Sequence, residues 1–76
     1  MPTTIAINHD LLRSWRIERG LSRERVAADV GTGANWLQII ESGTPGRVPS
    51  LDLVIRLARY FGHEPGELLM PAADPQ

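Results

Sequence analysis

The 76-residue sequence contains no cysteine. This excludes disulfide bridges, thiolate metal ligands and a nucleophilic cysteine, and it fits a reducing compartment such as the cytoplasm. The two histidines, His9 and His63, are far apart, and no third ligand stands at a suitable spacing, so we expect no metal site and no cofactor. A chain of this length forms one small domain and leaves little to enclose an active site, so we do not expect an enzyme.

Lysine is also absent, and all eight basic residues are arginine. The net charge is −1, yet five of the eight arginines lie between Arg13 and Arg25. A compositional bias of the source genome would explain the choice of arginine; the alternative is that guanidinium groups are used to bind phosphate or guanine. Apolar runs are too short for a membrane span, and the first residues do not resemble a signal peptide, so we expect a cytoplasmic protein without membrane contact.

Helix caps and apolar spacing predict an all-α fold, a compact bundle of five short helices. Residues 1–8 read as an N-terminal arm, in which 4–7 is weakly strand-like but has no evident partner strand, and 71–76 read as a frayed tail. The domain between them covers residues 9–70. Its helices are expected at 9–19, 23–30, 33–42, 51–61 and in a short segment that begins at Pro65.

The stretch from Leu21 to Gly43 predicts two helices separated by a short glycine turn. Ala27, in the middle of the first, is small enough to let the second cross close over it. This geometry is that of a helix-turn-helix, which presents a rigid helix to the major groove of DNA.

An ordered set of residues then resembles the Cro/C1-type, lambda-repressor-like (XRE-type) helix-turn-helix family across about residues 9–70. The matching positions are Leu12-Arg13, Arg16, Gly20-Leu21-Ser22, Ala27, Gly31, Leu37, Ile40-Glu41, Gly43, Pro49-Ser50-Leu51, Leu57-Ala58, Phe61-Gly62 and Glu67-Leu68-Leu69. The resemblance implies a dimeric, sequence-specific transcriptional regulator, most often a repressor, whose third helix reads double-stranded DNA. It also implies that Arg16 and Glu41 form a structural ion pair between the first and third helices.

On the third helix, Asn35 and Gln38 are the residues able to read adenine, and no basic residue lies between Val26 and Gly46. Expected base contacts are made by Ala34, Asn35, Gln38 and Ile39. Expected DNA-backbone contacts are made by Arg23, Thr32, Gly33, Trp36, Thr44 and Arg47. Three of these have alternatives: Trp36 could pack against the protein, and Arg23 and Arg47 could be solvated surface charges. Trp15 is expected in the core.

Surplus apolar residues suggest a partner, which we expect to be a second copy of the chain. The surplus comprises Ile5, Ile7, Leu53 and Ile55, which a larger single-chain core would also explain. The expected dimer interface is the apolar tip formed by Leu68, Leu69 and Met70. The competing hypothesis is a protein-interaction module or antitoxin that retains the fold without specific DNA readout and binds a second protein. No small-molecule ligand is indicated.

Overall fold

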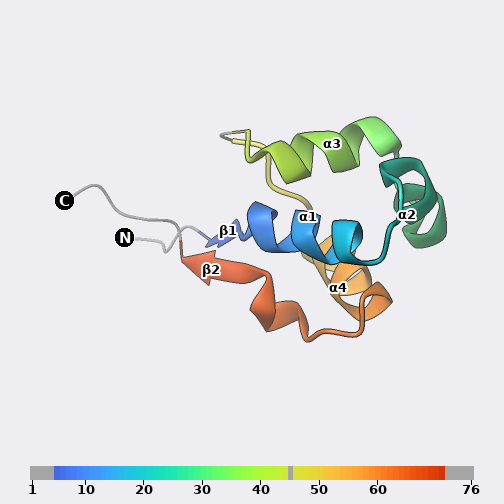
Figure 1. Cartoon of the computed structure of the whole chain (residues 1–76). Helices are drawn as coiled ribbons and strands as arrows, with labels where there is room; N and C mark the ends of the chain where they lie inside the picture. Colours follow the sequence, from blue (N-terminus) through green and yellow to red (C-terminus); the bar gives the residue numbers. More distant parts are fainter. Residues whose placement is uncertain (1–4, 45, 72–76) are drawn as a thin grey trace.

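The computed structural model describes residues 5–44 and 46–71. These residues form four α-helices, one 3-10 helix and one two-stranded sheet (Figure 1). In chain order the elements are β1 (Ile5–Ile7), α1 (His9–Glu18), α2 (Arg23–Val30), α3 (Ala34–Ser42), α4 (Leu51–Tyr60), η1 (Pro65–Glu67) and β2 (Leu69–Pro71). Residues 1–4 of the expected arm and 72–76 of the expected tail lie outside this part of the chain.

Polar caps set where three of the helices begin. The side chains of Asn8, Ser22 and Ser50 each accept a hydrogen bond from the backbone N–H three residues later, at the start of α1, α2 and α4. Such a cap satisfies one of the free N–H groups of a first helical turn. These helices therefore begin where the sequence predicts.

The predicted fifth helix is wrong, because only the 3-10 turn η1 forms there. Gly66 is a poor helix former, and Pro71 biases the residue before it toward extended backbone. After one tight turn the chain therefore becomes extended as β2. The expected five-helix bundle is in fact four α-helices, a 3-10 turn and a small sheet.

The sheet also corrects the expectation that the N-terminal strand has no partner. β1 pairs antiparallel with β2, with Ile5 opposite Pro71 and Ile7 opposite Leu69. The backbone N–H of Asn8 then donates to the carbonyl of Leu68 at 2.7 Å. The arm is thereby tied to the C-terminal segment at the end of α1 away from α2 (Figure 1).

One apolar core joins the helices. Its largest fully buried side chains are Phe61, Leu12, Leu37, Leu57, Leu68, Val26 and Val54. Trp15 is buried as expected; its ring stacks on His63 at 4.0 Å between centroids and lies 5.9 Å from the ring of Phe61. Two of the surplus apolar residues, Ile7 and Leu53, also belong to this core.

The burial of Leu68 overturns its assignment to a dimer interface. Its exposed fraction is 0%, so it offers no surface to a second chain. Leu69 is half-buried and packs against the core. The side chain of Met70 lies outside those the structure describes.

Candidate nucleic-acid interface

The turn between α2 and α3 depends on Gly31, which has a left-handed backbone with φ of 82°. The N–H groups of Gly31 and Thr32 both donate to the carbonyl of Ala27, at 2.9 and 2.8 Å. The carbonyl of Val30 accepts from Nη1 of Arg56 at 2.6 Å. The C-terminal end of α2 is therefore capped by its own backbone and by Arg56 of α4. This capping fixes the direction of α3 relative to α2.

We expect Gly31→Ala to lower the free energy of unfolding by about 1–2 kcal/mol, because a left-handed backbone is unfavourable for alanine. The added Cβ would also lie 3.2 Å from Arg56 Nη1 and disturb that cap. Urea unfolding followed by tryptophan fluorescence measures the change. Gly66→Ala is the control, since nothing lies within 4 Å of its Cβ and its φ is not positive. Equal stability of the two variants would contradict this reading of the turn.

The two faces of α3 are clearly divided. Leu37, Ile40 and Glu41 point inward and are at most 3% exposed. Asn35 and Gln38 are exposed on the opposite face. The remaining side chains expected to face DNA, Ala34, Trp36 and Ile39, are half-buried. The exposed face of α3 therefore presents two amides.

Two of these half-buried residues, Ala34 and Trp36, pack against the core. The ring of Trp36 therefore packs against the protein, which was the alternative to a DNA contact. Because it is half-buried, part of the indole remains accessible. Ala34 and Ile39 present less surface than the sequence suggested.

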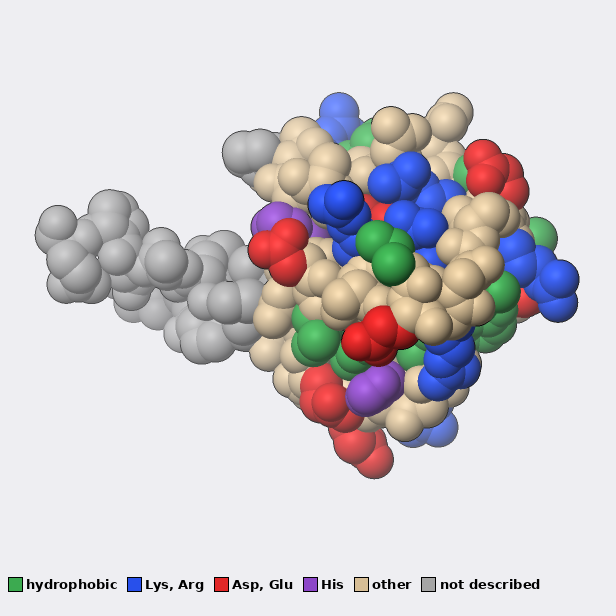
Figure 2. Space-filling view, in the orientation of Figure 1, with side chains coloured by type: hydrophobic (Ala, Val, Ile, Leu, Met, Phe, Trp, Pro, Cys, Tyr) green, Lys and Arg blue, Asp and Glu red, His purple; other side chains and the backbone are tan. Residues whose placement is uncertain are grey.

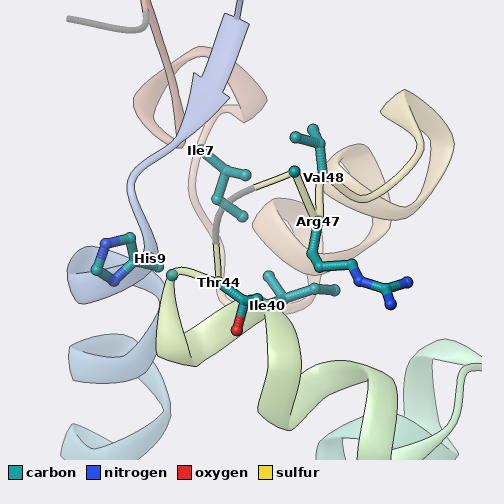
Figure 3. Close-up of a pocket in the computed structure, with 8 residues that line it drawn as sticks. Ile7, His9, Ile40, Thr44, Arg47 and Val48 are labelled. Atoms are coloured by element: carbon teal, nitrogen blue, oxygen red, sulfur yellow. The ribbon is translucent and has the colours of Figure 1, made fainter.

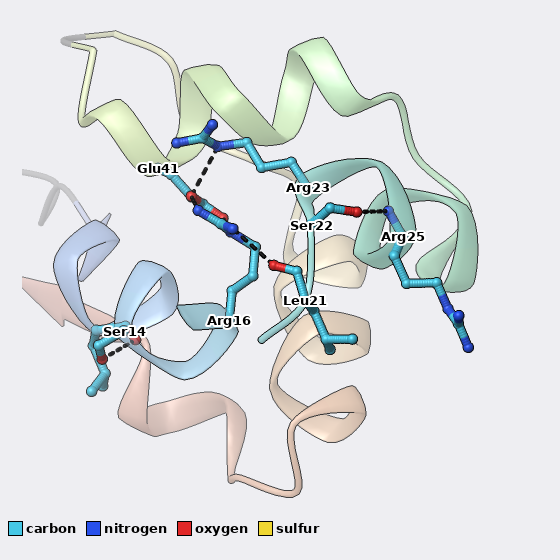
Figure 4. A network of polar contacts seen from close by, with 8 residues as sticks. Ser14, Arg16, Leu21, Ser22, Arg23, Arg25 and Glu41 are labelled. Carbon is cyan, nitrogen blue, oxygen red and sulfur yellow. Dashed lines mark hydrogen bonds and ion pairs between the residues drawn. The ribbon is translucent and has the colours of Figure 1, made fainter. Parts of the chain in front are cut away.

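Glu41 joins three helices through two arginines (Figure 4). Arg16 on α1 binds it with two nitrogens, Nε to Oε2 at 2.8 Å and Nη2 to Oε1 at 3.0 Å. Arg23, the first residue of α2, donates from Nε to Oε1 at 3.1 Å. Since the Glu41 side chain is 1% exposed and that of Arg16 is 11% exposed, this is a largely desolvated pair of forked geometry.

The pair between Arg16 and Glu41 was expected, whereas the participation of Arg23 was not. Arg16 Nη1 also donates to the carbonyl of Leu21 at 2.9 Å, which holds the segment before α2 against α1. Arg23 is 38% exposed, so its terminal nitrogens remain accessible while Nε is engaged. The bond between Arg23 and Glu41 depends on how α2 and α3 cross, so the local sequence carries no signal for it.

Arg25 faces a different partner, although it lies only two residues after Arg23. Its Nε donates to Asp29 Oδ2 at 2.9 Å, and the hydroxyl of Tyr60 on α4 donates to the same oxygen at 2.6 Å. The bonds from Tyr60 and Arg25 lower the pKa of the Asp29 carboxyl, and the bond to Asp29 raises the pKa of the Tyr60 phenol. Arg25 thus belongs to a surface contact between α2 and α4.

The loop after α3 forms the rim of a hollow of about 150 Å³. In Figure 3, His9 lies on one side of Ile7, Arg47 and Val48 lie on the other, and Ile40 lies below them in this view. Thr44 is exposed on this rim, and its hydroxyl shares a hydrogen bond of 2.8 Å with that of Ser42. Arg47 is exposed as well, so the structure places both expected backbone-contact residues of the loop at the surface.

The remaining expected backbone contacts lie at the start of α3. Thr32 is half-buried, and Gly33 is exposed and precedes the first turn without a side chain to cap it. The first N–H groups of α3 therefore have no side-chain acceptor at this cap, and such a helix terminus favours an anion.

Arginines gather on the face that carries α1 and α3. Figure 2 shows basic side chains concentrated between these helices, in the orientation of Figure 1. A chain with a net charge of −1 thus carries a local cluster of basic side chains, with acidic side chains around it on the same face. In the part of the chain described, no three His, Cys, Asp or Glu side chains are arranged to hold a metal ion. No helix of that part is both long and apolar enough to cross a membrane.

Comparisons with known proteins agree with this geometry. Residues 10–69 match a family described as "Helix-turn-helix domain". Over 58 residues the chain is 38% identical to the cryptic phage CTXphi transcriptional repressor RstR of Vibrio cholerae; the alignment covers 76% of this chain and 50% of that protein. The chain thus spans about half the length of this curated relative. No solved structure gives a significant match.

The family match covers most of the chain and includes every element that builds the turn and the three-helix ion network. The predicted Cro/C1-type relationship is thereby confirmed, and the chain belongs to the helix-turn-helix domain family.

Proposed function

We propose that the protein is a sequence-specific DNA-binding transcriptional repressor that places α3 in the major groove. The observation that carries the proposal is the division of α3: Glu41 anchors its buried face, while Asn35 and Gln38 are exposed on the other. Amide side chains make paired hydrogen bonds to adenine, which gives sequence readout. The similarity to a phage transcriptional repressor supports the same function.

Contacts to the DNA backbone would fix the position of α3 on the duplex. We assign them to Arg23, whose terminal nitrogens are accessible, and to Thr44 and Arg47 on the exposed loop. The free N–H groups after Thr32 and Gly33 supply a further phosphate site, and the accessible edge of Trp36 lies against the sugar-phosphate wall of the groove. These contacts carry no sequence information, so they contribute to all DNA binding alike.

Arg23→Ala tests these contacts through salt. Each phosphate contact adds about one unit to the slope of log affinity against log salt, so the variant should lose about one unit of slope. Its affinity should fall similarly for all sequences. Fluorescence anisotropy with labelled duplexes, from low to moderate salt, measures both quantities.

Arg25→Ala is the matched control, because it removes the same charge from the same helix. Arg25 is engaged by Asp29 beside α4, so its replacement should leave the slope unchanged. If both variants lose the same slope, general charge rather than a contact at Arg23 explains binding. If wild-type binding does not depend on salt at all, the proposed function fails.

The second candidate is a protein-interaction module that retains the fold. It is favoured by one observation: α3 carries no basic residue, and its half-buried Trp36 and Ile39 present apolar surface. An apolar protein contact need not weaken as salt rises, so the same titration separates the two functions.

We propose that the active species is a homodimer on a palindromic operator, since two-fold DNA sites match two-fold proteins. Such a regulator acts where the DNA is, in the cytoplasm, and needs no catalysis, cofactor or small ligand.

A further inference from the structure

An apolar strip begins in the last residues of the loop between α3 and α4. Among the described side chains, three large apolar residues are strongly exposed: Leu51 at 61%, and Val48 and Ile17 at 54% each. Val48 and Leu51 are three residues apart, so their Cα atoms lie within about 11 Å. Ile55 is half-buried and follows Leu51 by one helical turn, on the same face of α4. We call Val48, Leu51 and Ile55 the α4 strip.

Charges of both signs run beside the α4 strip. Asp52 and Arg56 form an ion pair at 2.8 Å, and their side chains are 76% and 45% exposed. Both therefore keep surface available to a partner. A face that carries an acid and a base one turn apart is complementary to a second copy of itself turned by 180°.

We propose that the chain self-associates through the α4 strip, with the two α4 helices antiparallel about a two-fold axis. Leu51 then packs on the partner's Ile55, and Asp52 lies beside the partner's Arg56. The two pairings are compatible, because their registers differ by two residues, which is about 3 Å along a helix and within reach of the long Arg56 side chain. Each is made twice in the dimer.

A second copy fits this surface better than an unrelated protein does, and this step rests on the proposed function. Half-sites one helical turn apart place each recognition helix about 17 Å from the two-fold axis. The two shorter dimensions of the domain are 23 and 21 Å, so two domains side by side fit that spacing. The strip starts at Val48, next to Arg47 on the loop assigned to the DNA backbone, which puts the axis beside the DNA-facing elements.

The first test is self-association without DNA, measured by sedimentation equilibrium of the full chain. We expect wild-type dimerisation, weakened by at least about tenfold in the double variant Val48→Ser, Leu51→Ser. Ile17→Ser is the matched control, because Ile17 is as exposed as Val48 but lies on α1. Circular dichroism shows that each variant is folded.

The second test uses charge reversal, and circular dichroism again checks that each variant is folded, because Arg56 also donates to the carbonyl of Val30. Asp52→Arg and Arg56→Asp should each weaken self-association, since each brings like charges together. A mixture of the two variants places two arginines opposite two aspartates, and it should associate more tightly than either variant alone.

Three results would overturn the proposal: a wild-type chain still monomeric at about 1 mM, a double variant that associates like wild type, or a mixture no tighter than its components. None of these measurements involves DNA. A chain that binds DNA but does not self-associate refutes only the interface, and a dimer that ignores DNA refutes only the proposed function.

Discussion

Glu41→Ala is expected to lower the free energy of unfolding by about 3–5 kcal/mol, the cost of leaving a buried charge without its partner. The effect is large because Arg16 is only 11% exposed and loses both of its carboxylate bonds. A small domain of marginal stability then has little free energy of unfolding left. Urea unfolding, followed by the fluorescence of the buried Trp15, measures the loss.

Glu24→Ala is the control for this substitution. Glu24 is an exposed glutamate in the first turn of α2, so its removal should change stability by less than about 1 kcal/mol. Arg23 should not rescue the Glu41 variant, because its own bond to Glu41 is lost as well. Equal stability of the two glutamate variants would show that the three-helix network contributes nothing.

Asn35→Ala and Gln38→Ala are expected to weaken binding to the preferred DNA site by about 1–3 kcal/mol each, which is roughly 5- to 150-fold. Each removes two hydrogen-bonding groups that can pair with the edge of one base. Affinity for unrelated DNA should not change, because backbone contacts remain. Both residues are exposed, so folding stability should be nearly unaffected.

Competition binding between the preferred site and its single-base variants measures this preference. Ser42→Ala is the control, because Ser42 lies at the exposed end of α3 and its hydroxyl is engaged by Ile39 and Thr44. Loss of preference at one base pair in each amide variant supports direct readout. Unchanged preference in both variants would remove α3 from the recognition surface.

Local signals in the sequence were sufficient for the four α-helices. Each of α1, α2 and α4 begins after a side-chain cap, and α2 and α3 each end at a left-handed glycine, Gly31 and Gly43. Caps and glycines act within a few residues, so they can be read from a single sequence. The predicted boundaries consequently agree with the structure to within about one residue.

Long-range contacts were the part that local signals could not supply. Three-residue strands have weak patterns, and the pairing of Ile7 with Leu69 depends on the whole core bringing them together. The burial of Leu68 follows from the same closure, and it removes Leu68 from the expected dimer surface. The sequence shows that Leu68 is apolar, but not whether its side chain faces the core or the solvent.

The candidate site likewise contains some features that the sequence predicted and one that it did not. The pair of Arg16 and Glu41 was expected through the family resemblance, and the exposure of Asn35 and Gln38 through helical periodicity. The third member of the ion network, Arg23, depends on the angle between α2 and α3, which no local pattern encodes.

Selection of DNA sequences by the purified protein, at low and at moderate salt, shows whether the protein recognises a specific DNA site. We expect enrichment of a two-fold symmetric site with half-sites about one helical turn apart, bound less tightly as salt rises. Failure to enrich any sequence, with only weak binding that disappears at moderate salt, would contradict it.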